Sequence, residues 1–414
     1  MNEDFLHQSV TVMGLGYIGL PTASLLATRG FQVHGVDVNP DVVATINRGD
    51  IHIVEPELDI LVRSAVQSRQ LSASTDPEEA DVFILAVPTP FGEDKRPDLS
   101  CVEAATRRMA AVLKPGNLVI LESTSPVGTT ERVAQWIGEA RPDLSEGQVR
   151  IAHCPERVLP GRIIQELVTN DRVVGGLDEA ATEAATAFYR QFVSGDVLAT
   201  TARTAEMAKL TENTFRDVNI ALANELSVIC DRLGINVWEL IQLANRHPRV
   251  NILMPGPGVG GHCIAVDPWF IVDSAPEQSR LIRISREVND GKPDHVITQV
   301  RARAERLRDP VIACLGLAYK SDVDDLRESP ALRITQTLAR EKVGRILAVE
   351  PYARRGLPAA LLELGVEHVG VERALEEADV LVMLVAHRQF RRLPPAPLQQ
   401  KMVVDACGLL SLLQ

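Results

Sequence analysis

The cysteine Cys263 follows a run of glycine, proline and valine that reads GPGVGG over residues 256–261, and Asp267 comes four residues after it. Glycine at this density predicts a backbone that turns repeatedly or packs closely against another surface. A thiol presented by a loop of exposed backbone N–H groups ionises more readily, and the thiolate is the nucleophilic form. From this stretch alone, a buried structural cysteine beside an ordinary turn is an equally good interpretation.

A long helix is predicted before this loop, because residues 201–234 contain no proline and no glycine until Gly234. Lys209, Asn213 and Arg216 have the spacing i, i+4, i+7 and therefore project from one face. On spacing alone, a solvated surface is the simpler interpretation of that face. The apolar residues predict a buried side: Met207, Leu210, Val218, Leu222, Leu226 and Ile229.

The N-terminal part carries a dinucleotide-binding pattern. A short apolar strand over 10–13 runs into GLGYIG at residues 14–19, and a helical stretch follows. The glycines Gly14, Gly16 and Gly19 let the backbone approach a pyrophosphate, whose charge the helix N-terminus favours. The strand predicted over 32–36 ends at Asp37, where a carboxylate accepts from the ribose 2′-hydroxyl of NAD and repels the 2′-phosphate of NADP. The sequence therefore predicts an NAD-binding domain.

Further buried strands are predicted over 80–87, 118–122 and 149–153. Ligands of doubly wound sheets bind beyond the carboxyl ends of the strands. The polar residues that follow these strands are therefore candidates for the ligand site: Thr89, Thr124, Thr130, Glu156 and Arg157. Turn or cap roles for the threonines, and a solvated ion pair for Glu156 and Arg157, are the alternatives.

The C-terminal part repeats the first pattern. Residues 378–387 (ADVLVMLVAH) match ADVFILAVPT of residues 80–89 almost residue for residue, and strand runs over 310–320, 345–351 and 402–405 accompany them. The third glycine of the fingerprint is missing, which favours a nucleotide other than a dinucleotide. We predict an α/β protein with two Rossmann-like doubly wound parallel-sheet domains joined by a long central helix, divided into residues 1–200, 201–304 and 305–414.

The composition excludes several functional classes. The chain has 414 residues and a net charge of −12, which argues against a general nucleic-acid binder. Its six cysteines lack metal-type spacing, so we expect a reduced cytoplasmic protein without a metal site. The acidic N-terminus is not a signal peptide, and we expect no membrane segment.

An ordered set of motifs resembles the nucleotide-sugar 6-dehydrogenase (UDP-glucose/GDP-mannose dehydrogenase) family. The motifs are GLGYIGLP, VPTPF, STSPVGTT, CPERVLPG, AEMAKLTENTFRDVNIALANELS, NRHPRVN, GPGVGGHCIAVDP, GLAYK and DDLRESPA. The resemblance covers nearly the whole chain. It implies a homodimer that oxidises C6 of a UDP-sugar from alcohol to acid with two NAD, through a covalent thioester.

The resemblance also implies roles for individual residues. Cys263 would be the nucleophile, Lys209 would assist proton transfer and stabilise oxyanions, and Asn213 would hold the reacting oxygen. Glu156 would assist a water, and Asp267 matches the aspartate of the cysteine loop. Besides the glycines, the matched cofactor contacts are Tyr17, Ile18, Asp37, Thr89, Thr130 and Arg327. The matched substrate contacts are Arg157, Val158, Lys209, Asn213, Arg216, His247, Arg249, Gly260, Tyr319 and Lys320, some of which the family takes from the partner subunit.

Departures from the family pattern bear on the substrate. Pro160 stands where the UDP-glucose branch has a second glutamate, and His262 and Val266 flank the cysteine differently from the UDP-glucose and GDP-mannose branches. These differences indicate a UDP-N-acetylhexosamine. Overall likeness favours UDP-N-acetyl-D-mannosamine, an envelope-polysaccharide precursor, over the N-acetylglucosamine epimer. A two-electron hydroxyacid dehydrogenase and an NAD-binding sensor without turnover are the more distant alternatives.

Overall fold

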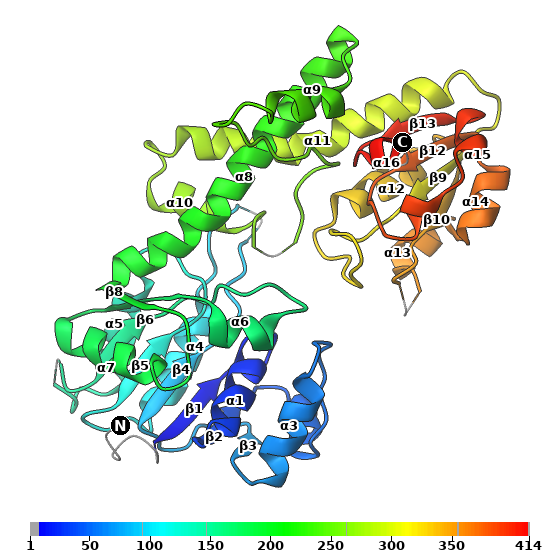
Figure 1. Ribbon diagram of the computed structural model, residues 1–414. Helices are drawn as coiled ribbons and strands as arrows, with labels where there is room; N and C mark the ends of the chain where they lie inside the picture. Colours follow the sequence, from blue (N-terminus) through cyan, green and yellow to red (C-terminus); the bar gives the residue numbers. More distant parts are fainter. Residues whose placement is uncertain (1–7, 93, 146, 262, 354–355, 413–414) are drawn as a thin grey trace. The chain divides into compact units, whose positions relative to one another are not determined.

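The computed structural model describes residues 8–92, 94–145, 147–261, 263–353 and 356–412 (Figure 1). His262, one of the residues from which we predicted the substrate, lies outside the described residues. The chain forms two compact units, residues up to 212 with 269–275, and residues 213–268 with 276–414. Our division into three domains remains a prediction.

The first unit is built on an eight-stranded sheet with the order β3-β2-β1-β4-β5-β6-β7-β8. Its strands are β1 (Ser9–Met13), β2 (Gln32–Val36), β3 (Leu71–Ser74), β4 (Val82–Leu85), β5 (Leu118–Leu121), β6 (Arg150–His153), β7 (Arg172–Gly176) and β8 (Val197–Thr201). Its helices are α1 (Gly19–Thr28), α2 (Pro40–Asn47), α3 (Leu58–Gln67), α4 (Ser100–Ala110), α5 (Thr129–Ala140), α6 (Ile163–Thr169) and α7 (Glu179–Tyr189). The predicted doubly wound sheet is confirmed, with one difference: β7 pairs antiparallel with β6.

Alternation of side chains explains why this sheet is covered on both faces. Val82 and Ile84 of β4 belong to the core shared with α1, α3 and α6, whereas Phe83 and Leu85 belong to the core shared with α4 and α5. Successive strand residues point to opposite faces, so a continuous apolar run is buried twice. The carboxyl ends of the parallel strands β1–β6 lie on one edge of the sheet, where ligands of such sheets bind, whereas β7 and β8 run in the opposite direction.

The second unit contains a five-stranded parallel sheet with the order β11-β10-β9-β12-β13. Its strands are β9 (Val311–Leu315), β10 (Arg345–Val349), β11 (Glu367–His368), β12 (Val380–Met383) and β13 (Met402–Asp405). Its helical segments are α9 (Val237–Ala244), α11 (Arg280–Ala304), α12 (Pro330–Arg340), α13 (Ala359–Glu363), α14 (Val371–Glu377), η2 (Phe390–Arg392), α15 (Pro395–Gln399) and α16 (Leu409–Leu412). This strand order repeats β3-β2-β1-β4-β5 of the first sheet, which confirms the predicted second Rossmann-like half.

Two helices have residues in both units, α8 (Ala202–Leu233) and α10 (Asp267–Ser274). The predicted long helix over 201–234 is confirmed, and Gly234 follows it with φ = +69°. The predicted buried side is wrong in part. Met207 and Leu222 are exposed, whereas Asn213 and Asn224 are fully buried. Much of the inner face of α8 is polar because a second helix supplies hydrogen-bonding partners for it.

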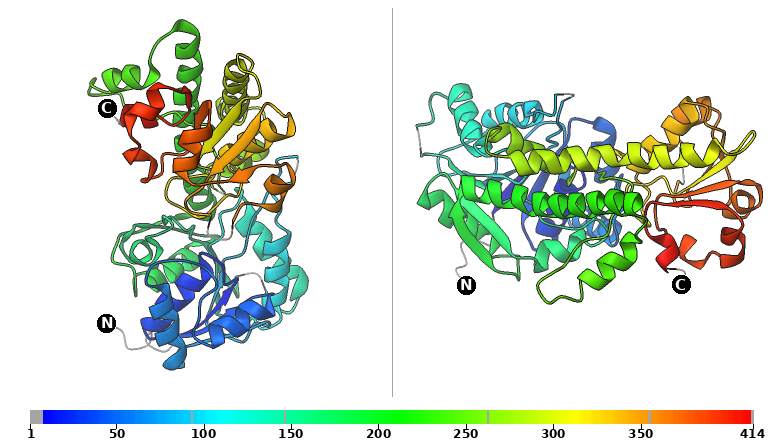
Figure 2. Two further views of the ribbon diagram at one scale, coloured as in Figure 1. Left: turned by 90° about the vertical axis from the view of Figure 1, so that its right-hand side faces the viewer. Right: turned by 90° about the horizontal axis from the view of Figure 1, so that it is seen from above.

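That second helix is α11, which lies beside the later part of α8 (Figure 2). Arg286 donates to Asp217 at 2.6 Å, and both side chains are buried. Further along, Asn224 and Asn289 share a hydrogen bond of 2.8 Å between their side chains. The contacts advance in the same direction on both helices, so the helices run parallel. Buried polar groups are tolerated only when they are paired in this way.

Lys292 extends this buried set by donating to Ser227 at 2.6 Å. Burial lowers the pKa of Lys292 to about 8, although the nearby Asp231 opposes the shift. Within the described residues, none of the helices is long and apolar enough to cross a membrane.

Candidate functional site

The glycine turn between β1 and α1 has the geometry of a dinucleotide site. Gly14 has φ = +92°, and its N–H donates to the Val36 carbonyl at 2.8 Å. A Cβ on Gly19 would lie 1.8 Å from the Gly14 oxygen, so only glycine allows this approach. A Cβ on Gly16 would meet nothing within 4 Å, so the backbone there is open to a ligand. Tyr17 and Ile18 follow Gly16 in this turn.

Asp37 follows β2 at the same edge of the sheet. Its two carboxylate oxygens accept from the backbone amides of Leu15, at 3.1 Å, and Asn39, at 2.9 Å. The side chain is only half-buried, so lone pairs of the carboxylate stay accessible for a ribose hydroxyl. The residues present therefore fit NAD.

The predicted threonines differ in their surroundings. The Thr89 hydroxyl donates to the Thr124 carbonyl at 2.6 Å, which joins the loops after β4 and β5. Thr130 is fully buried, and its hydroxyl donates to Glu206 at 2.6 Å. Neither Thr129 nor Thr130 caps α5; instead, Glu206 accepts from the backbone amides of Gly128 and Thr130. Glu206 has no local sequence signal, because it reaches this helix from α8.

Glu156 pairs with a residue that sequence reasoning missed. Its partner is Arg172 of β7, at 3.5 Å, and both side chains are almost completely buried. Arg157, its sequence neighbour, instead pairs with Glu212. The second oxygen of Glu156 accepts from the Val158 amide at 2.8 Å. The solvated Glu156–Arg157 ion pair considered above is therefore wrong.

The buried position of Glu156 changes its acidity. Burial raises the pKa of its carboxyl, although Arg172 and Lys209 oppose the shift. Glu122, at the end of β5, shows a similar effect: burial raises its pKa to about 7 against the attraction of Arg172. Carboxyls with raised pKa values suit proton transfer near neutral pH.

In the second unit, Cys263 is exposed and lies four residues before the start of α10 at Asp267. Its carbonyl accepts from the amides of Val266, at 3.0 Å, and Asp267, at 2.9 Å, which turns the chain into the helix. The side chain therefore stands at the N-terminal end of α10, where the helix dipole favours a thiolate. The buried-cysteine interpretation of this stretch is wrong.

Asn213 is fully buried between two predicted site residues. Its amide nitrogen donates to Asp267 at 2.5 Å, and its oxygen accepts from Arg216. Asn213 of α8 is thus hydrogen-bonded to Asp267 of the cysteine loop, and both were predicted from the sequence as site residues. Lys209 lies one helical turn before Asn213 on α8.

The glycine loop is packed more closely than any other residue type would allow. A Cβ on Gly260 would lie 2.4 Å from the Glu328 carbonyl, and one on Gly261 would lie 2.9 Å from the Tyr319 ring. The Gly256 amide donates to the buried Asn224 of α8 at 2.9 Å. The predicted close packing of the glycines is therefore confirmed.

Other predicted site residues lie on exposed loops of the second unit. His247 and Arg249 are exposed, and the Arg249 amide donates to the His247 ring at 3.4 Å. Lys320 is exposed, and Arg327 forms an ion pair with Asp325. In the part of the chain that the structure describes, no group of three or more His, Cys, Asp or Glu side chains could hold a metal ion.

Three domain models of one family together match most of the chain. They are the NAD-binding domain of the UDP-glucose/GDP-mannose dehydrogenase family (residues 8–193), its central domain (residues 203–291) and its UDP-binding domain (residues 313–411). The chain belongs to the UDP-glucose/GDP-mannose dehydrogenase family and is an NAD-dependent oxidoreductase.

Two curated relatives and one solved structure are similar to this chain over nearly its whole length. A Ralstonia nicotianae protein named NDP-N-acetyl-D-galactosaminuronic acid dehydrogenase is 59% identical, over 99% of this chain and 97% of its own. The UDP-N-acetyl-D-mannosamine dehydrogenase of Escherichia coli is 55% identical, over 97% and 99%. The structure of the UDP-D-ManNAc dehydrogenase of Pyrococcus horikoshii matches with a TM-score of 0.87 and 40% identity, over 97% of this chain and 96% of that one.

Proposed function

We propose that this protein oxidises C6 of UDP-N-acetyl-D-mannosamine from the alcohol to the carboxylate through a thioester on Cys263. The observation that carries this proposal is the exposed Cys263 thiol at the start of α10, in a chain that belongs to an NAD-dependent dehydrogenase family. A two-electron alcohol oxidation needs no nucleophile, whereas oxidation to the acid needs a means to hold the aldehyde.

The residues divide the chemistry between them. Lys209 accepts or relays the proton of the C6 hydroxyl and stabilises the oxyanion, and Asn213 holds the reacting oxygen. NAD held at the glycine turn and Asp37 would supply the hydride acceptor for each of the two oxidations of C6. The Cys263 thiolate adds to the aldehyde carbon to give a thiohemiacetal, which becomes a thioester when the second hydride leaves.

Hydrolysis of the thioester then requires an activated water. Glu156 is suited to accept the proton of that water, because its burial raises the pKa of its carboxyl. Attack of the water on the thioester carbon releases the carboxylate product and returns the thiol of Cys263. The buried Arg172 holds the carboxylate of Glu156 in place.

The identity of the sugar rests on comparison and on the residues around the cysteine. Mannosamine enzymes from several bacteria are 55–57% identical to this chain. The relative from Ralstonia nicotianae, at 59%, makes the galactosamine epimer the second candidate. Its name concerns a galactosaminuronic acid, which has the same C6 carboxylate chemistry.

Counting NADH per sugar across a panel of UDP-sugars tests the proposal. The panel holds the N-acetylmannosamine, N-acetylgalactosamine and N-acetylglucosamine epimers with UDP-glucose. We expect two NADH and one uronate per molecule of UDP-N-acetyl-D-mannosamine, and the highest kcat/KM for that sugar. One NADH per sugar with an aldehyde product would overturn the thioester route. A clear preference for another epimer would overturn the choice of sugar.

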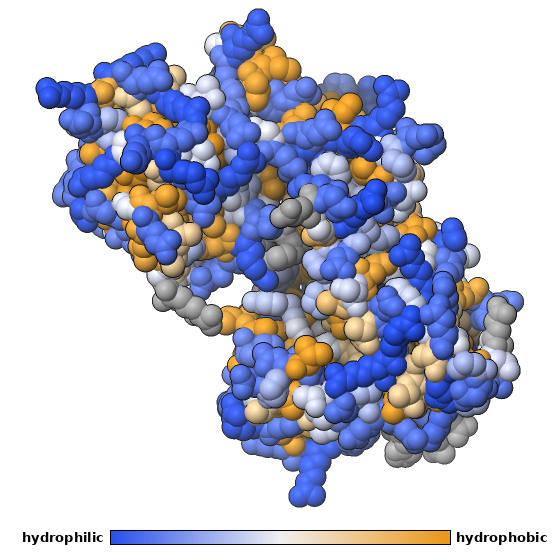
Figure 3. Space-filling model, turned by 180° about the vertical axis from the view of Figure 1, so that it is seen from behind, coloured by the Kyte–Doolittle hydropathy of each residue, from blue (hydrophilic) through white to orange (hydrophobic). Residues whose placement is uncertain are grey.

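We also propose that the chain functions as a homodimer whose interface includes α8. Apolar side chains are exposed along this helix, among them Phe215, Leu222 and Ile229. Apolar groups also interrupt the hydrophilic surface in the view from behind (Figure 3). Phe215, Leu222 and Ile229 are seven residues apart and therefore share one face of α8, and exposed apolar side chains that share a face are typical of subunit contacts. Sedimentation equilibrium should give about twice the chain mass of 45.2 kDa, and a monomer mass at working concentration would contradict the proposal.

The glycine turn offers a matched pair of variants. Gly16→Ala adds a methyl group in open space, so we expect normal folding but NAD affinity weakened about tenfold or more, because the methyl group would meet the pyrophosphate. Gly19→Ala forces a Cβ against the Gly14 carbonyl, so we expect a lower melting temperature as well. Calorimetric NAD titrations and thermal unfolding measure both effects. Unchanged NAD affinity in Gly16→Ala would show that the pyrophosphate binds elsewhere.

A further inference from the structure

Glu350 occupies the place in the second sheet that Asp37 occupies in the first. In each sheet the first glycine after the first strand donates to the last residue of the second strand, at 2.8 Å. The next amide donates to the acid: Leu15 to Asp37 at 3.1 Å, and Leu317 to Glu350 at 2.6 Å. The two acids are therefore structural counterparts, and their different surroundings can be compared directly.

The counterpart in the second sheet is fully engaged by the protein itself. Glu350 is buried, and one of its oxygens accepts from the amides of Leu317 and Ala318 and contacts His387 Nε2 at 3.2 Å. Asp37 is half-buried and accepts from a single amide at each oxygen. Burial would raise the pKa of Glu350, but the hydrogen bonds from His387 and from backbone amides outweigh it and lower that pKa. Glu350 is therefore a buried carboxylate with no accessible face for a ribose.

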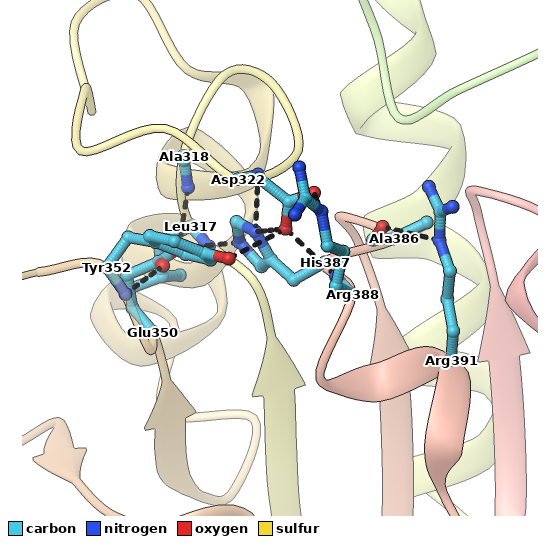
Figure 4. A network of polar contacts seen from close by, with 9 residues as sticks. All are labelled: Leu317, Ala318, Asp322, Glu350, Tyr352, Ala386, His387, Arg388 and Arg391. Atoms are coloured by element: carbon cyan, nitrogen blue, oxygen red, sulfur yellow. Dashed lines mark hydrogen bonds and ion pairs between the residues drawn. The ribbon is translucent and has the colours of Figure 1, made fainter. Parts of the chain in front are cut away.

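His387 completes this arrangement (Figure 4). It is fully buried, and it takes the place of Thr89 in the repeated strand run. The Asp322 amide donates to its Nδ1 at 2.9 Å, so Nδ1 is an acceptor and Nε2 carries the hydrogen. That hydrogen is then donated to Glu350. One imidazole thus links the carboxylate at the end of β10 to the backbone at Asp322.

Asp322 lies in the middle of residues 316–329, which we call the anchored loop. Its φ of +65° is unusual for a residue other than glycine and needs compensating contacts. Its carboxylate accepts from the Tyr352 hydroxyl at 2.9 Å, from the Arg388 amide at 2.9 Å and from the Arg388 side chain at 3.1 Å. The anchored loop is therefore held at its start by Glu350 and at its middle by His387.

The anchored loop touches the cysteine loop and carries predicted substrate contacts. Tyr319 and Lys320 belong to it. The Tyr319 ring lies beside Gly261, and the Glu328 carbonyl lies beside Gly260, both too close for a side chain at either glycine. Any shift of the anchored loop would therefore displace the backbone that precedes Cys263.

We propose that Glu350 and His387 are positioning residues, an internal anchor that replaces the ribose-binding acid of the first sheet and holds the anchored loop for the UDP-sugar. This inference rests on the proposed function, because the ligand of the loop is taken to be the UDP part of the substrate. In the second sheet, the acid after the second strand therefore holds a loop in place and is not accessible to the ribose of a dinucleotide.

A series of variants at one position tests the anchor. His387→Leu removes both hydrogen bonds, whereas His387→Gln retains an amide that can donate to Glu350. We expect His387→Leu to weaken UDP binding and raise KM for the UDP-sugar about tenfold, and His387→Gln to restore both within about threefold. The affinity for NAD should change less than that for UDP, because the NAD-binding domain is in the first unit and Arg327 alone of the matched cofactor contacts belongs to the anchored loop. His295→Leu is the control, since His295 also pairs with a carboxylate, Asp231, at 2.7 Å, but away from the anchored loop.

Amide hydrogen exchange gives a readout that does not depend on turnover. The amides of residues 317–322 should exchange about tenfold faster in His387→Leu than in wild type, since their opening free energy falls. If wild type oxidised no UDP-sugar, the proposed function would fail, while UDP affinity and exchange would still decide the anchor. Unchanged UDP affinity and KM in a folded His387→Leu variant would overturn the inference. If that variant does not fold, His387→Asn replaces it, because the shorter amide can reach the Asp322 N–H but not Glu350. Unchanged exchange, UDP affinity and KM in His387→Asn would overturn the inference.

Discussion

Cys263→Ser should retain NAD and UDP-sugar binding but form uronate at a rate lower by on the order of 10³-fold or more. The substitution replaces one exposed atom at the start of α10, so the fold and the glycine loop should be unaffected. Stopped-flow NADH formation and mass spectrometry of the sugar products measure the loss. Binding of both ligands is checked by calorimetry.

The expected size follows from the chemistry of the two side chains. A thiolate forms far more readily than an alkoxide and is the stronger nucleophile toward an aldehyde. Without the thiohemiacetal, the aldehyde cannot be held for the second hydride transfer. We therefore expect at most one NADH per sugar from Cys263→Ser, with no acid.

Two other cysteines serve as controls. Cys101 is exposed in the first unit, so Cys101→Ser should keep full activity. Cys154 is fully buried, and burial raises the pKa of its thiol to about 12, so Cys154→Ala should have a mild effect. Uronate formation at the normal rate by Cys263→Ser would show that the covalent mechanism is wrong for this protein.

Arg286→Met should be the most destabilising single substitution that we predict, at about 3–5 kcal/mol. The guanidinium donates to Asp217 from a position where both side chains are almost fully buried. Removing it leaves a carboxylate inside the α8–α11 contact without its counter-charge. Burial already raises the pKa of Asp217 against the attraction of Arg286, so the unpaired carboxylate would be costly. Urea unfolding of the purified protein measures the change.

Arg301 provides the matched control, on the same helix. It pairs with Glu341, and both side chains are well exposed. Arg301→Met should change the free energy of unfolding by only about 0–1 kcal/mol, because solvent screens exposed pairs. The double variant Arg286→Met, Asp217→Leu should be more stable than Arg286→Met alone, since it removes the unpaired charge. If Arg286→Met cost no more than Arg301→Met, the buried pair would not be a major source of stability.

Loss of the Arg286–Asp217 pair should also change the position of the cysteine loop. Asn289 donates to Asp217 at 2.8 Å and accepts from Asn224, which in turn accepts from the Gly256 amide. The stability of the α8–α11 contact and the position of the loop before Cys263 therefore share one chain of hydrogen bonds.

The sequence by itself determined the features that depend on local patterns. The glycines of residues 14–19, the acid at Asp37 and the strand runs predicted a doubly wound sheet, because turns and alternation are encoded in adjacent residues. The repeated run at residues 378–387 predicted the second sheet for the same reason. The glycines before Cys263 predicted close backbone packing, which the structure confirms.

Only the tertiary structure decided which distant groups pair. Glu156 meets Arg172 and not its neighbour Arg157, and Glu206 of α8 caps α5. Such partners are set by how elements pack, and no spacing in the chain specifies them. The polar inner face of α8 was missed because apolar residues were assumed to be inside. Hydrogen bonds from α11 satisfy the polar groups on one face of α8, so that face can be buried. Apolar residues on the rest of α8, such as Leu222 and Ile229, remain exposed.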